Sequence, residues 1–178
     1  SDLNICTGGI TAGIYALDVS DTIISNNKCS NNYTAGIYIR TMNAGTFSSI
    51  LIVDNICNDI KNASGVLGDG ICIEQGSTGI VNGLVVSKNF CSNCNNGIIL
   101  RPGNKNSIIS SNICYNNNVG IYIYQVNDIF LLNSNICMRS SYTSSQYTIH
   151  LATPTNGMVV NNLLLGKGVQ GYPASVLV

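Results

Sequence analysis

Two short phrases alternate along almost the whole chain, and this repeat restricts the fold more than any other feature of the sequence. The first phrase is Asn-x-Cys, where x is variable. It starts at seven positions, and in the last of them Leu164 replaces the cysteine: Asn4, Asn27, Asn55, Asn89, Asn112, Asn135 and Asn162. Self-similarity of this kind indicates structural units of one design stacked on one another.

The second phrase is Gly-Ile followed, after one variable residue, by an aliphatic residue. It starts at five glycines, with a degenerate copy at Thr148: Gly13, Gly36, Gly70, Gly97 and Gly120. The cysteines of the first phrase recur after 23, 28, 34, 23 and 23 residues, so the period is 23 with two expanded units. An aliphatic run, such as Ile50 to Val53, also precedes each asparagine from Asn27 onward.

Each unit therefore holds two or three short strands of period two, separated by turns rich in Asn, Gly and Ser. One such unit cannot bury its own apolar face, but stacked units bury a continuous column and pair each strand with the next coil. The sequence predicts an all-β fold: a single-stranded right-handed parallel β-helix of about seven coils of roughly 23 residues. We assign residues 1–165 to the β-helix and residues 166–178 to a C-terminal tail that caps it or leads into a missing domain.

Matched positions in stacked coils should form columns of like side chains. Six cysteines of the Asn-x-Cys phrases are predicted to point inward, because free cysteine behaves as a small buried hydrophobe. Leu164 at the seventh copy supports this, and disulfides are the alternative. The asparagines are predicted to form a ladder, since amides about 4.8 Å apart can bond one another.

The charge pattern excludes several classes of partner. Charged residues make up 9% of the chain and the formal net charge is zero, so the basic surface that nucleic acid requires is missing. No basic run or long apolar stretch indicates membrane binding or insertion. Cys91-x-x-Cys94 lacks the second pair that a zinc site needs, and histidine and aspartate do not cluster. We expect no metal and no cofactor.

With these phrases covering nearly the whole chain, the sequence resembles the parallel β-helix repeat family. That family includes pectate-lyase-like enzymes, polygalacturonases, polysaccharide-depolymerising phage tailspikes and non-enzymatic surface proteins. The Gly-His-Gly and Arg-Ile-Lys signatures of polygalacturonase-like enzymes and the multi-aspartate calcium cluster of pectate lyases are absent from this sequence. Its Asn-rich, charge-poor style is similar to tailspike-type depolymerases. This resemblance implies an extracellular or virion-surface location and a homotrimer formed through missing flanking segments.

The outward residues of the Gly-Ile strands are predicted to form two parallel rows. The first row is Tyr15, Tyr38, Cys72, Ile99, Tyr122 and His150, and the second is Leu17, Arg40, Glu74, Arg101, Tyr124 and Ala152. Aromatic rings stack on the apolar faces of sugars, and arginine binds carboxylates through two hydrogen bonds. The rows predict a polysaccharide site whose substrate-binding residues are Tyr15, Tyr38, Tyr122, Tyr124 and His150.

The candidate catalytic residues are Glu74, Arg40 and Arg101. A lyase would use a base beside a uronate carboxylate, with arginine stabilising the charge that develops. A hydrolase needs two carboxyl groups. Glu74 is the only glutamate and Asp69 is interpreted as a turn residue, so the second carboxyl group would come from a neighbouring chain.

A non-catalytic interpretation remains open. Glu74 could simply neutralise two arginines, and the tyrosines could be ordinary strand residues of a structural or adhesive spike. Three expanded segments, residues 41–49, 58–69 and 75–83, favour the functional interpretation, because they are expected to surround the Arg40–Glu74 pair. Long loops on a rigid scaffold often carry function.

Overall fold

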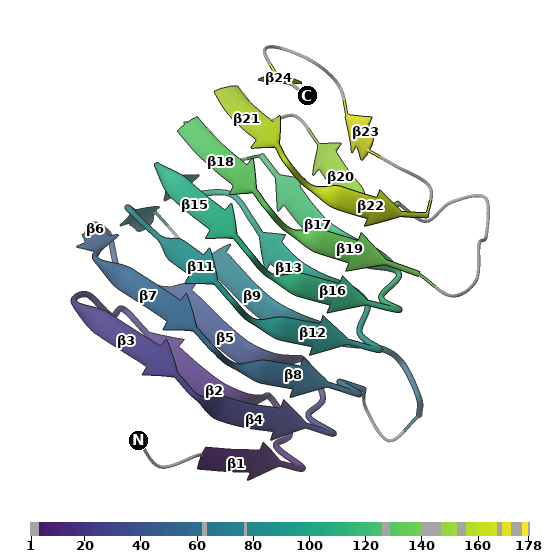
Figure 1. The fold of residues 1–178 in the computed structure, drawn as a ribbon. Helices are drawn as coiled ribbons and strands as arrows, with labels where there is room; N and C mark the ends of the chain where they lie inside the picture. The colour runs from purple at the N-terminus through teal and green to yellow at the C-terminus, as the bar shows by residue number, and fades with distance from the viewer. Residues whose placement is uncertain are drawn as a thin grey trace.

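The computed structural model describes residues 4–61, 64–76, 78–125, 129–139, 147–152, 156–166, 169–171 and 176–177. Within these ranges the chain is an all-β parallel solenoid without a helix. Strands that neighbour each other in a sheet belong to successive coils, and every pairing between strands is parallel. Figure 1 shows the resulting stack, which rises from the N-terminal strand to the C-terminal strand.

Three long sheets form the walls, each with seven strands in the described part of the chain. The cysteine sheet contains β1 (Asn4–Thr7), β4 (Asn27–Ser30), β8 (Ile56–Asn58), β12 (Phe90–Ser92), β16 (Ile113–Tyr115), β19 (Ile136–Met138) and β22 (Leu163–Leu165). The glycine sheet contains β2 (Ala12–Leu17), β5 (Ala35–Thr41), β9 (Asp69–Gln75), β13 (Asn96–Leu100), β17 (Val119–Tyr124), β20 (Ile149–Ala152) and β23 (Val169–Gly171). The aliphatic sheet contains β3 (Thr22–Ser25), β7 (Ile50–Val53), β11 (Val85–Ser87), β15 (Ser107–Ser110), β18 (Ile129–Asn133), β21 (Asn156–Val160) and β24 (Val176–Leu177).

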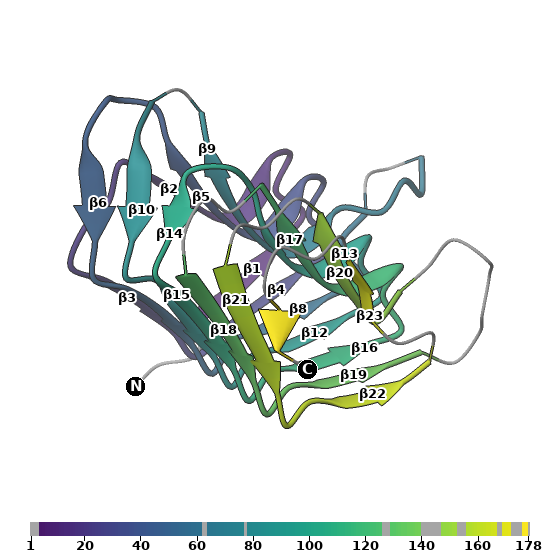
Figure 2. The ribbon, with the colours of Figure 1, turned by 90° about the horizontal axis from the view of Figure 1, so that it is seen from above.

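A fourth, smaller sheet was not expected from the sequence. It contains β6 (Thr46–Ser48), β10 (Ile80–Asn82) and β14 (Asn104–Lys105), and we call it the side sheet. β6 and β10 lie in two of the expanded segments, residues 41–49 and 75–83. Figure 2 shows the side sheet as an extra wall between the glycine and aliphatic sheets. Two of the three expanded segments therefore pair with each other instead of forming separate loops.

The predicted cysteine column is confirmed. The six cysteines pair in register from strand to strand, Leu164 follows Cys137, and all eight cysteines are free thiols. The glycines explain why the two phrases occur together. A Cβ atom on Gly36 would lie 2.8 Å from Sγ of Cys57, and one on Gly97 would lie 2.9 Å from Sγ of Cys114. Only glycine leaves room for the cysteine behind it.

The core is fully closed over about five turns, fewer than the seven coils predicted. Five cysteines and five isoleucines are almost completely buried: Cys29, Cys57, Cys91, Cys114, Cys137, Ile37, Ile71, Ile98, Ile121 and Ile149. By contrast, Cys6, Ile14 and Leu164 are only partly buried. Each coil is covered above and below only by its neighbouring coils. A coil at either end of the stack has a neighbour on one side only, so its inward residues stay partly exposed. Each buried isoleucine contributes about 1.5–3 kcal/mol.

The asparagines form a continuous ladder of side-chain hydrogen bonds. Each Nδ2 donates to Oδ1 of the next asparagine over 2.9–3.0 Å, through Asn4, Asn27, Asn55, Asn89, Asn112, Asn135 and Asn162. From Asn27 to Asn135, the same Oδ1 also accepts the backbone N–H of the preceding asparagine. The ladder satisfies buried polar groups at the corner between the aliphatic and cysteine sheets.

Segment 166–178 contributes strands to the walls. β23 pairs with β20, and β24 pairs with β21. The described parts of this segment therefore continue two of the sheets, and the boundary at residue 165 stays a prediction.

Candidate active site on the outer face of the glycine sheet

The two predicted rows exist, because the strands of the glycine sheet pair in the expected register. Tyr15 pairs with Tyr38, Tyr38 with Cys72, Cys72 with Ile99, Ile99 with Tyr122 and Tyr122 with His150. In the second row Leu17 pairs with Arg40, Arg40 with Glu74 and Tyr124 with Ala152. The backbone N–H of Arg101 bonds the carbonyl of Ile73, which places Arg101 beside Glu74.

The middle of the first row is buried, which corrects the expectation of an exposed strip. Tyr38, Cys72 and Ile99 have 7%, 2% and 3% of their surface exposed, and they form a second apolar cluster with Ala35. The cluster lies on the outer face of the glycine sheet, where Tyr38 bonds Glu74 of the second row and Cys72 lies beside Arg101. Of the five predicted substrate-binding residues, Tyr15 is 46% exposed and Tyr124 is 36% exposed, while Tyr122 and His150 are half-buried.

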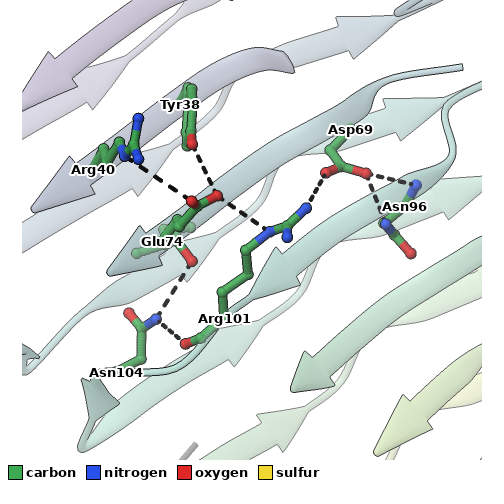
Figure 3. A network of polar contacts seen from close by, with 8 residues as sticks. Tyr38, Arg40, Asp69, Glu74, Asn96, Arg101 and Asn104 are labelled. Atoms are coloured by element: carbon green, nitrogen blue, oxygen red, sulfur yellow. Dashed lines mark hydrogen bonds and ion pairs between the residues drawn. The ribbon is translucent and has the colours of Figure 1, made fainter. Parts of the chain in front are cut away.

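Arg101 lies between two carboxyl groups. Its Nε is 3.4 Å from Oε2 of Glu74, and its Nη2 is 3.6 Å from Oδ2 of Asp69. Arg40 approaches Glu74 from the preceding coil, with Nε 4.0 Å from Oε1. Figure 3 shows this chain of contacts from Arg40 through Glu74 and Arg101 to Asp69. We call these four residues the charged cluster.

Asp69 is not a turn residue, as the sequence interpretation held, but the first residue of β9. It is 6% exposed, and its Oδ1 accepts hydrogen bonds from Nδ2 of Asn96 at 2.7 Å and from the backbone N–H of Asn96 at 3.3 Å. Burial raises the pKa of Asp69 above its ordinary value, against the opposing effects of Asn96 and Arg101. A carboxyl group of this kind holds its proton to higher pH and can donate it.

Glu74 is more accessible than Asp69 and is held differently. Its side chain is 24% exposed, against 9% for Asp69. The hydroxyl of Tyr38 donates a hydrogen bond of 2.8 Å to Oε2 of Glu74. Beneath them, burial raises the pKa of the Cys72 thiol to about 12, so this cysteine is not a nucleophile near neutral pH. The two carboxyl groups therefore occupy different environments within one site.

Buried polar atoms without a hydrogen-bond partner gather around the charged cluster. Among the described residues there are six such side-chain atoms. Two of them, Nε of Arg40 and Nε of Arg101, form ion pairs with Glu74 but no hydrogen bond, and Oγ1 of Thr41 and Oδ1 of Asn104 are two others. Asn104 positions the strand by donating to the carbonyl of Arg101 at 2.7 Å. Unsatisfied buried polar atoms are uncommon in native proteins and often mark functional places.

The remaining predicted residues form an aromatic cluster further along the same face. The rings of Tyr122 and His150 stack with centroids 4.6 Å apart and planes at 5°. The ring centroid of Tyr124 lies 5.9 Å from that of Tyr122, and the ring centroid of Tyr147 lies 5.8 Å from that of His150. Burial lowers the pKa of His150, which favours the neutral ring. At the other end Tyr15 and Tyr38 meet edge to face at 5.3 Å. The structure thus places aromatic groups on both sides of the charged cluster.

Comparison with solved structures identifies the architecture. A mutant of the periplasmic alginate epimerase AlgG matches over 96% of this chain with a TM-score of 0.51 and 15% identity. DFA-IIIase from Arthrobacter chlorophenolicus A6 without its lid matches over 96% with a TM-score of 0.50 and 14% identity. The chain is a parallel β-helix protein. It spans 51% of the length of each of these two chains, and at such identities the likeness concerns the fold alone.

The chain matches no protein-family profile and no curated protein. In the described ranges no helix is long and apolar enough to cross a membrane. Those same ranges contain no group of three or more His, Cys, Asp or Glu side chains arranged to hold a metal ion.

Sequence reasoning missed Asp69 because the β-helix strand is irregular at Gly70. Gly36 and Ile37 both face the interior, so the in–out alternation slips by one residue at each Gly-Ile phrase. Ala35, which pairs with Asp69, consequently shares the outer face with Tyr38. Asn96 stands at the matching position of the next coil. A polar pair at the residue before successive Gly-Ile phrases was the available signal.

Proposed function

We propose that this parallel β-helix binds a polysaccharide along the outer face of its glycine sheet and cleaves it at the charged cluster. The observation that carries the proposal is the placement of Asp69 and Glu74 on either side of the Arg101 guanidinium. Two carboxyl groups in unequal environments are the usual requirement for cleaving a glycosidic bond. Because both belong to one chain, a carboxyl group from a neighbouring chain is not required.

The roles follow from the environments. Asp69, buried and with a raised pKa, would protonate the oxygen of the leaving sugar. Glu74, the more accessible carboxylate, would accept a proton from water or attack the sugar directly. Arg101 would keep both side chains in place, and Arg40 would bind an anionic substituent of the sugar, since arginine recognises carboxylates well. Tyr15 on one side and Tyr122, Tyr124 and His150 on the other would hold neighbouring sugar rings.

The comparisons support a carbohydrate ligand in a general way. One of the similar structures is an alginate epimerase, and alginate is a polysaccharide. The fold by itself does not fix an activity, so the proposed activity depends on the charged cluster. An extracellular or virion-surface location and a tailspike-like parent protein remain parts of this proposal that rest on the sequence resemblance alone. The homotrimer implied by that resemblance stays a prediction outside this proposal.

Two other functions make different demands on the same residues. A lyase would require a base to remove a proton beside a uronate carboxylate, with Arg40 or Arg101 stabilising the resulting charge. A structural or adhesive spike would require the shape of the face but no chemistry. The first would release unsaturated sugars and the second would release nothing.

The test is incubation of the protein with a panel of acidic and neutral bacterial polysaccharides. New reducing ends without ultraviolet absorbance from unsaturated uronates would support hydrolysis. Reducing ends together with that absorbance would identify a lyase and overturn the hydrolytic roles. If neither signal appears on any polymer, for this chain and for any longer parent protein, the enzymatic proposal is wrong.

Variants then locate the chemistry. We expect Asp69→Asn and Glu74→Gln each to lower the cleavage rate by about 100-fold or more, because each removes one proton-transfer group. Asp54→Asn is the matched control, since Asp54 is exposed in a turn with φ of 57° that asparagine also tolerates. Full activity in Asp69→Asn would remove Asp69 from the mechanism.

A further inference from the structure

The outer face of the cysteine sheet carries a row of apolar side chains that the proposed function does not use. One residue of each strand points outward in register, and we call the set the apolar row: Ile5, Lys28, Ile56, Phe90, Ile113, Ile136 and Leu163. Six of these seven residues are large and apolar. Ile5 is 67% exposed and Leu163 is 51% exposed, while Ile56, Phe90 and Ile113 are 36–39% exposed.

The neighbouring row on the same face widens the patch toward the C-terminal coils. It changes from polar to apolar along the stack, in the order Thr7, Ser30, Asn58, Ser92, Tyr115, Met138 and Leu165. Tyr115 is 41% exposed and Leu165 is 49% exposed. Single exposed apolar residues need no explanation, but a contiguous patch of this extent on a soluble domain usually marks an interaction surface.

From this face we infer that the cysteine sheet is an isologous interface, on which a second copy of the same chain packs. The spacing of the row argues for a copy rather than an unrelated partner. Side chains stand in ridges about 4.8 Å apart along the whole stack. A second copy offers ridges with the same repeat, so the two rows can interdigitate at every coil, as identical sheets do in steric zippers.

Charge also favours self-association. Lys28 is the only charged residue among the fourteen outward residues of the two rows. The chain as a whole has a formal net charge of zero. Two copies therefore approach without long-range repulsion, and a net charge near zero promotes association.

A stable dimer requires only a small part of the molecular surface. The accessible surface of the molecule is 7929 Å². A specific interface needs about 800 Å² from each partner, which is about a tenth of the surface of a small protein. The cysteine sheet is one of three long walls that run the length of the stack, and Figure 1 shows its strands side by side from β1 to β22. The glycine sheet faces a different direction, so the dimer leaves the charged cluster open (Figure 2).

The test is sedimentation velocity over protein concentrations from about 1 to 100 μM. We expect the unmodified chain to form dimers in this range. Ile113→Glu places a charge in the apolar row and should raise the dissociation constant at least about 30-fold, the effect of losing an interface hot spot. Ile108→Glu is the matched control. Ile108 is 40% exposed on β15, a strand of the aliphatic sheet, so this substitution should leave the dimer intact.

A gain-of-function variant separates loss of binding from loss of folding. Lys28→Leu removes the one charge in the apolar row and should tighten the dimer by about tenfold, provided circular dichroism and thermal unfolding show an intact fold. Monomers at every concentration would overturn the inference. So would equal weakening by Ile108→Glu, unchanged affinity in Lys28→Leu, or trimers, which require two different faces in contact rather than one. None of these outcomes depends on catalytic activity.

Discussion

The hydroxyl of Tyr38 donates a hydrogen bond of 2.8 Å to Oε2 of Glu74, one coil further along the stack. The ring of Tyr38 is buried in the outer apolar cluster, so this bond ties the accessible carboxylate to a fixed support. Tyr38 was predicted as a platform for sugar rings. Because its ring is buried, we propose a positioning role for Tyr38, whereas Tyr15 is the exposed ring of that pair.

Replacing Tyr38 by phenylalanine tests this positioning role. The ring should still fill the cluster, so the melting temperature should change little. Loss of a hydrogen bond to a charged group is worth about 1.5–3 kcal/mol. We therefore expect cleavage of the polysaccharide to slow by about tenfold or more with little change in KM. Tyr33→Phe, on an exposed tyrosine outside the site, serves as the control. Unchanged kcat in Tyr38→Phe would contradict the assignment.

The raised pKa of Asp69 predicts how stability depends on pH. The folded chain holds this proton more tightly than the unfolded chain, whose carboxyl group titrates near 3.8. The stabilisation is therefore fully present below that value and is lost as the pH rises through the folded pKa. Urea unfolding at a series of acidic pH values should show this decline in the unmodified protein and a flatter profile in Asp69→Asn. Identical profiles would show that Asp69 does not titrate abnormally.

The asparagine ladder predicts a large difference between its middle and its end. The side chain of Asn89 accepts a hydrogen bond from Asn55 and donates one to Asn112. Its Nδ2 also donates to two backbone carbonyls. Removing it leaves buried groups unpaired, at about 1–3 kcal/mol for each such group. Asn4 is exposed and makes one ladder bond, to Asn27. Asn89→Ala should therefore lower the free energy of unfolding by several times as much as Asn4→Ala, as measured in urea. Similar losses would mean that the ladder is not a stabilising unit.

The buried thiols predict a simple chemical result. Seven cysteines are buried, and Cys6 alone is partly exposed. Burial is the largest of the effects that raise the pKa of Cys6, so even this thiol should react slowly near neutral pH. A colorimetric thiol reagent should modify one cysteine in the folded protein and eight after denaturation. Rapid reaction of several thiols without denaturant would show that the solenoid opens readily.

The stacked pair of Tyr122 and His150 predicts a binding effect separate from the chemistry. Tyr122→Ala should weaken polysaccharide binding by about tenfold, because an aromatic contact is worth roughly 0.5–1.5 kcal/mol beyond the area it buries. Cleavage of bound substrate should be nearly unaffected. Calorimetric titration with a non-cleaved polymer on Glu74→Gln and on the double variant isolates this contribution. Equal affinity would place the sugar chain elsewhere.

The sequence by itself determined the columns and rows of this protein. Asn-x-Cys and Gly-Ile recur at a fixed period, and stacking turns matched positions into neighbours one strand apart. The cysteine column, the asparagine ladder and the pairing of Arg40 with Glu74 all follow from that arithmetic. Register in a stacked β-helix is a local property, so it can be counted along the chain.

The tertiary structure alone decided which of those positions are buried and which further residues lie beside them. Two of the expanded segments pair in the side sheet, the core closes over about five turns, and Tyr38, Cys72 and Ile99 are buried in an outer apolar cluster instead of facing solvent. Asp69 reaches the outer face because the close approach of Gly70 to Cys91 shifts the alternation by one residue. Each of these depends on contacts between coils whose spacing varies, and a repeat counted along the sequence carries no information about them.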